Sequence, residues 1–459
     1  MEQTAQREKF SSRLGFILIS AGCAIGLGNV YRFPIWTGAY GGAIFVIFYL
    51  LFLILLGIPC MCAELSVGRA SKRSIATSFN VLERKGQKWH LMRYLGIAGN
   101  YLLMMFYTTI TGWFLNYFAK YLTGTVDSAT DTTSVFVNMT SSPGQCIIFT
   151  AAVIILCFAV CMLGLQNGVE KITKVMMIAL LVLIIGLGIY ACTLSGAKQG
   201  LKFYLIPSFE SVENYGLTTV ISAAMSQAFF TTSIGIGSIA IFGSYIDRDR
   251  ALLGESLTII GLDTFVALMS GLIIFPAYFT FNPTATGIPA EKAGASFLFI
   301  TLSDIFNNMK GGRVIGTLFF LFMVFAAFST VIAVFENIMS FWLESTKLKR
   351  PVIAVINILL VLALSVPAML SENLLSSFFT NIFGKTAIDC EDFLVSNLAL
   401  PIGACVYVLF CTWNFGWGWD NFFDEINAGK GLKISKNLRI YMKYVLPVII
   451  AIVLVMSVI

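Results

Sequence analysis

Long apolar stretches separated by short polar loops run along this chain. A helix needs about 20 predominantly apolar residues to cross a bilayer, and the pattern contains eleven stretches of that order. They lie near residues 13–38, 41–68, 94–123, 145–165, 170–194, 215–245, 251–280, 310–344, 350–370, 391–414 and 440–459. The pattern predicts an all-α polytopic membrane protein with eleven transmembrane helices. No cleavable signal peptide is visible before the first stretch, so we expect its helix to be retained.

The first apolar stretch is interrupted in its middle. Where a plain membrane anchor carries Leu and Val, this stretch carries small, polar and helix-breaking residues: Gly22, Gly26, Gly28, Asn29, Arg32 and Pro34. Backbone groups cannot stay unpaired in hydrocarbon, so such a break persists only where the freed groups line a cavity or bind something. The interruption therefore predicts a binding site.

The sixth stretch is interrupted in a similar way, by hydroxyls and glycines between Gln227 and Gly237. It opens the second group of five stretches, as the first break opens the first group. Paired interruptions at matching places predict an inverted-repeat transporter with its site near the membrane midplane. The alternative is that these glycines only permit close helix packing. The predicted segments are a cytoplasmic N-terminal gate segment (1–12), a first repeat (13–194), an inverted second repeat (215–414) and an additional helix (440–459).

Composition excludes several other classes. With 58% hydrophobic and 12% charged residues, the chain has too little polar surface for a soluble globular protein. Most of the ten cysteines lie in or beside apolar runs, where a thiol acts as a small hydrophobe. The sequence contains no CxxC pair, and His90 is its only histidine. We therefore expect no His/Cys metal site. No Ser/His/Asp set, HExxH motif or P-loop points to an enzyme.

The distribution of Lys and Arg predicts the orientation. Basic residues gather before the first stretch, between the second and third, after the fourth and eighth, and before the eleventh, whereas the loop 123–144 carries only acidic charges. Because cytoplasmic loops are enriched in Lys and Arg, we expect a multi-pass protein of the cell (plasma or inner) membrane. Its N-terminus is then cytoplasmic and its C-terminus extracellular or periplasmic. This topology accounts for the net charge of +6, so we expect membrane lipid and no nucleic acid as a partner.

Three motifs together resemble one family. They are Gly22-Cys-Ala-Ile-Gly-Leu-Gly-Asn29 with Arg32-Phe-Pro34; Gly57-Ile-Pro59 with Glu64 and Gly68-Arg69; and Gln227-Ala-Phe-Phe-Thr231 with Ser233, Gly235 and Gly237. The chain resembles the neurotransmitter:sodium symporter family of the bacterial leucine-transporter type over essentially its whole length. The resemblance implies a 5+5 inverted repeat with broken helices 1 and 6. It also implies sodium-coupled symport by alternating access, with two sodium ions beside one substrate.

The resemblance assigns ligands to both sodium ions. Sodium is a hard cation, and carbonyl, amide, hydroxyl and carboxylate oxygens suit it. For the first ion it implies the Ala24 carbonyl, Asn29, Thr231, Asp263 and the carboxylate of the substrate. For the second ion it implies the carbonyls of Gly22, Ile25 and Ala326 and the hydroxyls of Ser329 and Thr330. Taken alone, Ser329 and Thr330 have the alternative of bonding back to the preceding helical turn.

Asp263 also predicts which ions the transport requires. An acid inside a membrane helix is functional by default. Chloride-dependent relatives bind an anion near the first sodium. Chloride-independent relatives carry an acidic side chain there instead. In one such pattern an Asn occupies the position of Asp263, and a Glu one helical turn later supplies the acid. This chain has Ala267 at that second position. We therefore expect the Asp263 carboxylate to supply the negative charge that chloride supplies in other relatives, so that transport requires no chloride.

The residue at the first break predicts the substrate class. Monoamine transporters of the family place an Asp where this chain has Gly26, so the substrate is expected to bring its own carboxylate. The carboxylate then meets the N–H groups of Leu27 and Gly28 and the hydroxyl of Tyr107. The amino group meets the carbonyls of Ala24, Phe230 and Thr231 and the hydroxyl of Ser233, with Thr330 nearby.

The expected side-chain pocket is formed by Leu103, Ile236, Val331 and Val334, with Phe230 above them. It carries no charge to compensate a charged side chain. The predicted substrate is a neutral, hydrophobic L-amino acid.

The resemblance also implies gates on both sides of the site. Arg32 and Asp392 form the outer one, with Tyr107 and Phe230 as a lid, and Arg7 and Glu344 form the cytoplasmic one; solvated helix-end charge is the alternative for Arg7 and Glu344. Some relatives unwind helix 5 between a Gly and a Pro, but this chain has Gly168 and then Ile178. The rival function is a non-transporting amino-acid sensor or receptor, although such a protein usually adds a soluble signalling domain.

Overall fold

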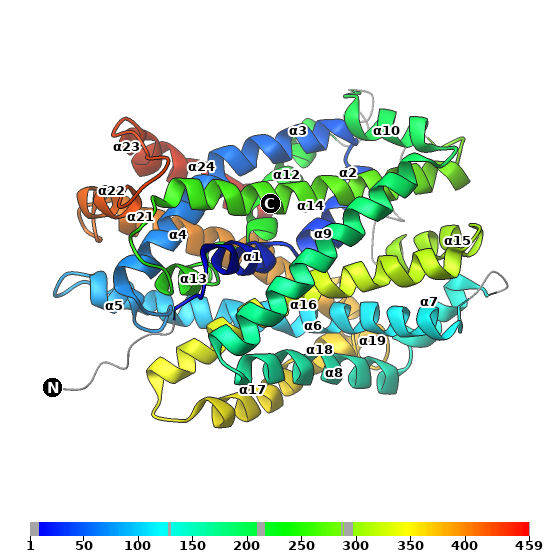
Figure 1. Cartoon of the computed structure of the whole chain (residues 1–459), viewed down its shortest axis with the longest axis horizontal. Helices are drawn as coiled ribbons and strands as arrows, with labels where there is room; N and C mark the ends of the chain where they lie inside the picture. The colour runs from blue at the N-terminus through cyan, green and yellow to red at the C-terminus, as the bar shows by residue number, and fades with distance from the viewer. Residues whose placement is uncertain (1–8, 127–129, 209–215, 286–287, 289–296, 459) are drawn as a thin grey trace.

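The computed structural model describes residues 9–126, 130–208, 216–285, 288 and 297–458. These residues form helices and connecting loops, with no β-strand among them (Figure 1). Seven helices in this part of the chain are long and apolar enough to cross a membrane. They are Ala43–Ser71, Pro143–Met162, Leu165–Cys192, Leu252–Phe281, Gly312–Ser345, Ala387–Thr412 and Leu438–Met456. A bent pair, Arg13–Ala24 and Gly28–Ala39, makes an eighth if it is one span.

Three further expected spans correspond to helices that are less apolar, divided or shorter than these. The stretch 94–123 is the 32-residue helix α6 (Met92–Thr123), which carries buried polar residues such as Asn100 and Thr111 because it lies inside the helix bundle. The stretch 215–245 is divided into α12 (Leu217–Thr232) and α13 (Ala240–Ser244), and 350–370 contains the shorter α17 (Arg350–Leu364). The number of eleven crossings stays a prediction.

The first half of the chain begins with the broken span. This span comprises α1 (Arg13–Ala24), the π-helical turn η1 (Gly28–Arg32) and α2 (Phe33–Ala39), with a bend of 52° at the break. The helices that follow, apart from α6, are α3 (Ala43–Phe52), η2 (Leu53–Gly57), α4 (Ile58–Ser71), α5 (Ser78–Leu82), η3 (Trp89–Leu91), α7 (Thr132–Thr140), α8 (Pro143–Met162), η4 (Leu165–Glu170), α9 (Lys171–Cys192) and α10 (Ala197–Leu205).

The second half begins with α12 and α13. Its other helices, apart from α17, are α14 (Leu252–Phe281), η6 (Phe297–Thr301), α15 (Leu302–Asn307), α16 (Gly312–Ser345), α18 (Val366–Met369), α19 (Ser376–Phe383), α20 (Ala387–Phe393), η7 (Leu394–Ala399), α21 (Leu400–Thr412), α22 (Trp419–Ile426), α23 (Leu438–Ile440), η8 (Tyr441–Val445) and α24 (Leu446–Val458).

Helix α1 lies in the middle of the bundle, where it packs against α9, α14 and α16 (Figure 1). Helices α6 and α16 pack along each other beside it, and the short α13 packs against α4. From Gly15 to Ala24, every residue of α1 is buried. The break at its end is therefore enclosed by protein on all sides, as irregular backbone at membrane depth requires.

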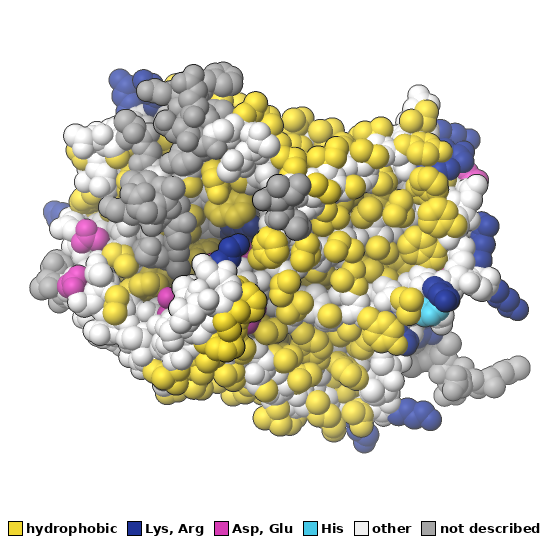
Figure 2. Space-filling model, turned by 180° about the vertical axis from the view of Figure 1, so that it is seen from behind, with side chains coloured by type: hydrophobic (Ala, Val, Ile, Leu, Met, Phe, Trp, Pro, Cys, Tyr) yellow, Lys and Arg dark blue, Asp and Glu magenta, His cyan; other side chains and the backbone are white. Residues whose placement is uncertain are grey.

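The surface agrees with a membrane location. In Figure 2 a broad band of hydrophobic side chains covers the middle of the molecule, while most of the visible Lys and Arg side chains gather at one end. Exposed aliphatic side chains on several helices contribute to such a surface, among them Ile54, Val182, Ile189 and Leu359. In water this apolar surface would be a liability, whereas lipid solvates it.

Candidate functional site

The backbone groups freed by the first break are paired with side chains. The N–H of Gly26 donates to Oδ1 of Asn29 at 3.0 Å, and the N–H of Leu27 donates to the hydroxyl of Tyr107 at 2.8 Å. The Gln227 amide donates to the carbonyl of Gly28 at 2.7 Å. Since a buried unpaired backbone group costs about as much as a lost hydrogen bond, these partners from α6 and α12 stabilise the break. The interruption predicted in the first span is confirmed.

The second break follows α12. Ser233 has a φ of 51°, in the left-handed region that non-glycine residues rarely adopt. Beyond it, Oε2 of Glu64 accepts a hydrogen bond from the N–H of Gly235 at 2.6 Å. Oε1 of Glu64 accepts from Ile239 and Ala240, at 3.0 and 3.3 Å. A fully buried carboxylate on α4 thus satisfies the free donors at the start of α13.

Removal of the Glu64 carboxylate is expected to destabilise the protein. Glu64→Ala leaves three buried N–H groups without their acceptor, at a cost of about 1–3 kcal/mol each. Glu64→Gln keeps one acceptor oxygen and should lose less. Thermal unfolding in detergent, followed by Trp fluorescence, measures the difference, with the exposed Asp304→Ala as the control. A Glu64→Ala protein that unfolds at the wild-type temperature would contradict this account of the second break.

Three oxygen-bearing side chains from three elements meet beside the two breaks. Nδ2 of Asn29 donates to both Oδ1 and the carbonyl of Asp263, at 2.8 Å each. Oγ1 of Thr231 donates to the same carboxylate, 3.1 Å from Oδ2. All three side chains are fully buried, and both donors to Asp263 are neutral. Neither of these donors neutralises the charge of the Asp263 carboxylate, which can therefore bind a cation at this point.

A second group of oxygens lies on the other side of the first break. Oγ1 of Thr330 is 3.2 Å from the carbonyl of Gly22 and 3.1 Å from that of Ile25. Oγ of Ser329 is 3.3 Å from the Ile25 carbonyl and 2.8 Å from that of Ala326. The resemblance implied these five residues as one ligand set, and the structure brings all of them together. The bond from Ser329 to Ala326 is also the contact with the preceding helical turn that was the alternative for Ser329. The set consists of carbonyl and hydroxyl oxygens, the donors that a hard monovalent cation prefers.

Between the two groups lies a small buried pocket. It is lined by Ala24, Gly28, Leu103, Tyr107, Phe230, Ser233, Thr330 and Leu400. Seven of these residues were predicted from the sequence; Leu400 was not. The other predicted substrate residues are buried without lining this pocket: Leu27, Thr231, Ile236, Val331 and Val334.

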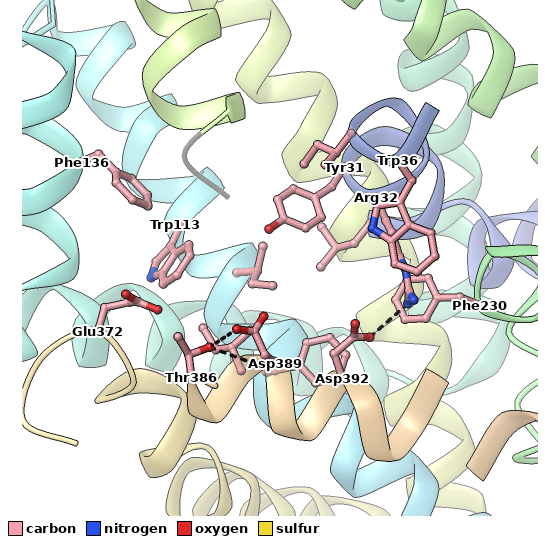
Figure 3. Close-up of a pocket in the computed structure, with 15 residues that line it drawn as sticks. Tyr31, Arg32, Trp36, Trp113, Phe136, Phe230, Glu372, Thr386, Asp389 and Asp392 are labelled. Carbon is pink, nitrogen blue, oxygen red and sulfur yellow. Dashed lines mark hydrogen bonds and ion pairs between the residues drawn. The ribbon is translucent and has the colours of Figure 1, made fainter. Parts of the chain in front are cut away.

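A larger cavity of about 380 Å³ lies next to the pocket, and Phe230 lines both (Figure 3). Nη1 of Arg32 lies 3.2 Å from Oδ1 of Asp392 and 2.8 Å from the hydroxyl of Ser396. The guanidinium also lies over the rings of Trp36 and Phe230, 4.0 and 4.6 Å from their centroids. The predicted outer pair is thus formed directly above Phe230.

The cytoplasmic pair can be followed only from one side, since Arg7 lies outside the described residues. Glu344 accepts hydrogen bonds from the N–H of Ser74 and the hydroxyl of Thr77, at 2.7 Å each. Nearby, Asp247 pairs with Lys9 at 2.7 Å and Lys72 at 3.2 Å. The hydrogen bond from Lys9 is the main cause that lowers the pKa of Asp247. This carboxylate therefore stays ionised well below neutral pH.

Helix 5 contains no proline where some relatives have one. It begins with the π-helical turn η4, which contains Gly168, and continues as the unbroken α9, in which Ile178 is exposed. The buried Glu170 at the end of η4 accepts hydrogen bonds from the N–H and hydroxyl of Ser11, at 2.9 and 2.5 Å. The chain before α1 is therefore attached to the start of helix 5.

Comparison with known proteins gives one consistent result. The model described as the sodium:neurotransmitter symporter family matches residues 7–142 and 131–459. The uncharacterized sodium-dependent transporter YhdH of Bacillus subtilis is 31% identical over 404 residues, with 88% of this chain and 87% of YhdH covered. The mouse sodium-dependent neutral amino acid transporter B(0)AT2 is 25% identical over 308 residues, with 60% of this chain and 41% of the mouse protein covered.

Among solved structures, the crystal structure of MhsT in complex with L-phenylalanine superimposes with a TM-score of 0.88 at 32% identity. The match covers 98% of this chain and all of MhsT. The predicted fold class, the leucine-transporter type with its inverted repeat, is confirmed.

Proposed function

Because the chain belongs to the sodium:neurotransmitter symporter family and is a sodium-dependent, multi-pass membrane transporter and not an enzyme, we propose that it takes up a neutral, hydrophobic L-amino acid. Uptake is coupled to sodium, proceeds by alternating access and needs no chloride. One observation carries this proposal: two groups of buried oxygens flank the first break, and a small pocket that is polar at one end lies between them.

The two oxygen groups are the proposed sodium sites. Asn29, Thr231 and Asp263, with the Ala24 carbonyl, hold the first ion, and the group around Thr330 holds the second. Two oxygen–oxygen distances of 3.1 Å support this, between Thr231 and Asp263 and between Thr330 and the Ile25 carbonyl, because oxygens this close can surround one ion with small movements. The Asn29 amide meets Asp263 through its nitrogen, so it must turn its Oδ1 toward the ion. Sodium is a co-transported substrate here.

The pocket measures about 10 Å³ in this conformation, so it must expand before an α-amino acid can enter, and its lining then supports one orientation of the substrate. The carboxylate lies toward the backbone of Gly28 and the hydroxyl of Tyr107, beside the first sodium, and the amino group lies toward Ala24 and Ser233. A Cβ at Gly26 would lie 2.0 Å from the Tyr107 hydroxyl oxygen and 2.3 Å from Oγ1 of Thr330. An acid at this position, as in monoamine transporters, therefore does not fit, which supports a substrate that carries its own carboxylate.

We further propose that the N-terminus is cytoplasmic and the C-terminus extracellular, as the positions of Lys and Arg indicate. The inverted repeats are then 13–194 and 215–414, and Arg32–Asp392 and Arg7–Glu344 close opposite sides. The outer pair suits a gate because the Asp392 side chain is 32% exposed and lines the cavity, so water can reach its carboxylate. The buried Arg32 keeps the hydroxyls of Ser226 and Ser396 as partners when the pair opens.

Loss of the outer pair is expected to speed release of substrate to the outside. Asp392→Ala leaves the Arg32 guanidinium with two hydroxyls and two aromatic rings but no anionic partner. The dissociation rate of bound amino acid should therefore rise roughly threefold to tenfold, consistent with the loss of one charge-assisted bond. Scintillation proximity with a tritiated substrate measures this rate. Asp389→Asn is the matched control, because Asp389 lines the same cavity and bonds to Thr386. Equal rates in both variants would argue against the gate.

The function is tested by uptake into proteoliposomes. Purified protein is reconstituted with potassium inside and sodium outside, and a panel of tritiated L-amino acids is offered with chloride or gluconate as the external anion. We expect accumulation of leucine-like or aromatic substrates, abolished without sodium and unchanged in gluconate. Binding without accumulation would favour a sensor, and uptake that requires chloride would overturn the role given to Asp263.

A further inference from the structure

Leu400 is the one residue that lines the buried pocket from outside the four helical regions predicted to form it. It is the first residue of α21, it is 1% exposed, and it follows the π-helical turn η7. The polar lining residues lie on the broken spans and on α6 and α16. Only Leu103, Phe230 and Leu400 present large apolar side chains to this pocket among the described residues.

The position of Leu400 is fixed by contact between backbones. A Cβ at Gly235 would lie 2.2 Å from the Leu400 carbonyl oxygen, and one at Gly403 would lie 1.9 Å from the Gly235 carbonyl oxygen. Neither distance leaves room for a side chain, so the second break and the start of α21 touch main chain to main chain. The backbone that carries Leu400 is therefore held directly against the second break.

Ile236, the expected wall from the second break, has a different position. A Cβ at Gly99 would lie 2.6 Å from Cγ2 of Ile236 and 3.7 Å from Cβ of Ala399. The Ile236 side chain therefore fills the space that α6 leaves at Gly99, one helical turn before Leu103. Ala399 lies beside the same glycine, and the next residue, Leu400, takes the place at the pocket.

We infer that Leu400 is a specificity-determining residue that limits the size of the substrate side chain. This inference rests on the proposed function, since it needs an amino acid whose polar end lies at Gly28, Tyr107 and Ser233. The side chain then extends toward the remaining apolar lining, with Phe230 above it. Leu103 lies on the continuous α6, and Leu400 closes the pocket from a helix that also carries Asp392 two turns away.

The test is a competition series in proteoliposomes. Valine, leucine, phenylalanine and tryptophan compete with whichever tritiated amino acid the wild type accumulates. Leu400→Ala is expected to raise the affinity for tryptophan relative to valine by about tenfold, and Leu400→Phe to lower it by a similar factor, since one or two methylene groups in an apolar pocket change selectivity by about 10–200-fold. Val408→Ala, buried on the same helix and outside the pocket lining, is the control for loosened packing.

The outcomes separate the inference from the proposed function. If the wild type accumulates amino acids and Leu400→Ala weakens all four competitors equally, as Val408→Ala does, Leu400 only supports the packing and the inference is wrong. If the wild type accumulates no amino acid, the proposed function itself fails. Opposite shifts in the Ala and Phe variants support the inference, and such opposite shifts cannot arise from general destabilisation.

Discussion

Replacement of Asp263 by Asn is expected to lower the apparent sodium affinity of uptake by roughly a hundredfold or more in chloride-free medium. The two side chains have the same shape, so Asn29 and Thr231 keep a neighbour to bond with. What disappears is the negative charge. Two unit charges 4 Å apart attract by about 4 kcal/mol at an effective dielectric constant of 20, and both donors that meet this carboxylate are neutral. The sodium dependence of initial uptake rates in gluconate measures the loss.

Two further measurements, one with added chloride and one on a double variant, test where the negative charge is needed. Adding chloride to Asp263→Asn should restore part of the sodium affinity if an anion can enter the position of the lost charge. The double variant Asp263→Asn/Ala267→Glu moves the acid one turn along α14, where Ala267 is fully buried, and should recover chloride-free uptake. An Asp263→Asn protein with the wild-type sodium dependence would show that the compensating charge lies elsewhere.

Gly26→Ala is expected to reduce uptake by at least tenfold while the protein still folds. The added methyl group would meet the hydroxyl oxygens of Tyr107 and Thr330 at 2.0 and 2.3 Å. Since both distances are far below van der Waals contact, Tyr107 must leave the N–H of Leu27, and Thr330 must leave the carbonyls of Gly22 and Ile25. Overpacking of this kind typically costs about 1–3 kcal/mol. Here it displaces the side chains that are proposed to bind substrate and sodium, so we expect uptake to fall more than stability.

Initial uptake rates together with thermal unfolding in detergent test this prediction. Gly261→Ala is the matched control, since a Cβ there meets nothing within 4 Å and Gly261 lies on α14 two residues from Asp263. It should transport within about twofold of the wild type and gain slightly in helix stability. Equal activity of the two variants would contradict the geometry given to the first break.

Polar residues in hydrocarbon marked candidate positions, and the resemblance to the family grouped them into two ligand sets. Asn29, Asp263 and Thr330 lie in runs where any apolar residue would serve, so their presence indicates a function. The structure brings their side chains to within about 3 Å of the expected neighbours. The pairing of Arg32 with Asp392 came from the resemblance, and the structure forms it, whereas Arg7 lies outside the described residues.

The apolar wall of the pocket could not be predicted in the same way. Leu400 lies in a run of hydrophobic residues in which nothing distinguishes one Leu from another. Its direction depends on the π-helical turn Leu394–Ala399, and one extra residue in a turn rotates everything after it by about 100°. A helical wheel with a constant period therefore assigns the wrong face. Val331 and Val334, chosen by family position, are buried beside the pocket without lining it.

The buried carboxylate of Glu64 has a consequence for how the membrane protein is made. Its three donors lie 171 to 176 residues further along the chain. At about 5–20 residues per second, the second span leaves the ribosome roughly 10–30 seconds before those donors exist. A carboxyl group that faces lipid without partners is unfavourable even when it is protonated. The second span should therefore stay beside the insertion machinery or its neighbouring helices until the sixth span arrives, which makes membrane integration of this chain a cooperative event across both halves.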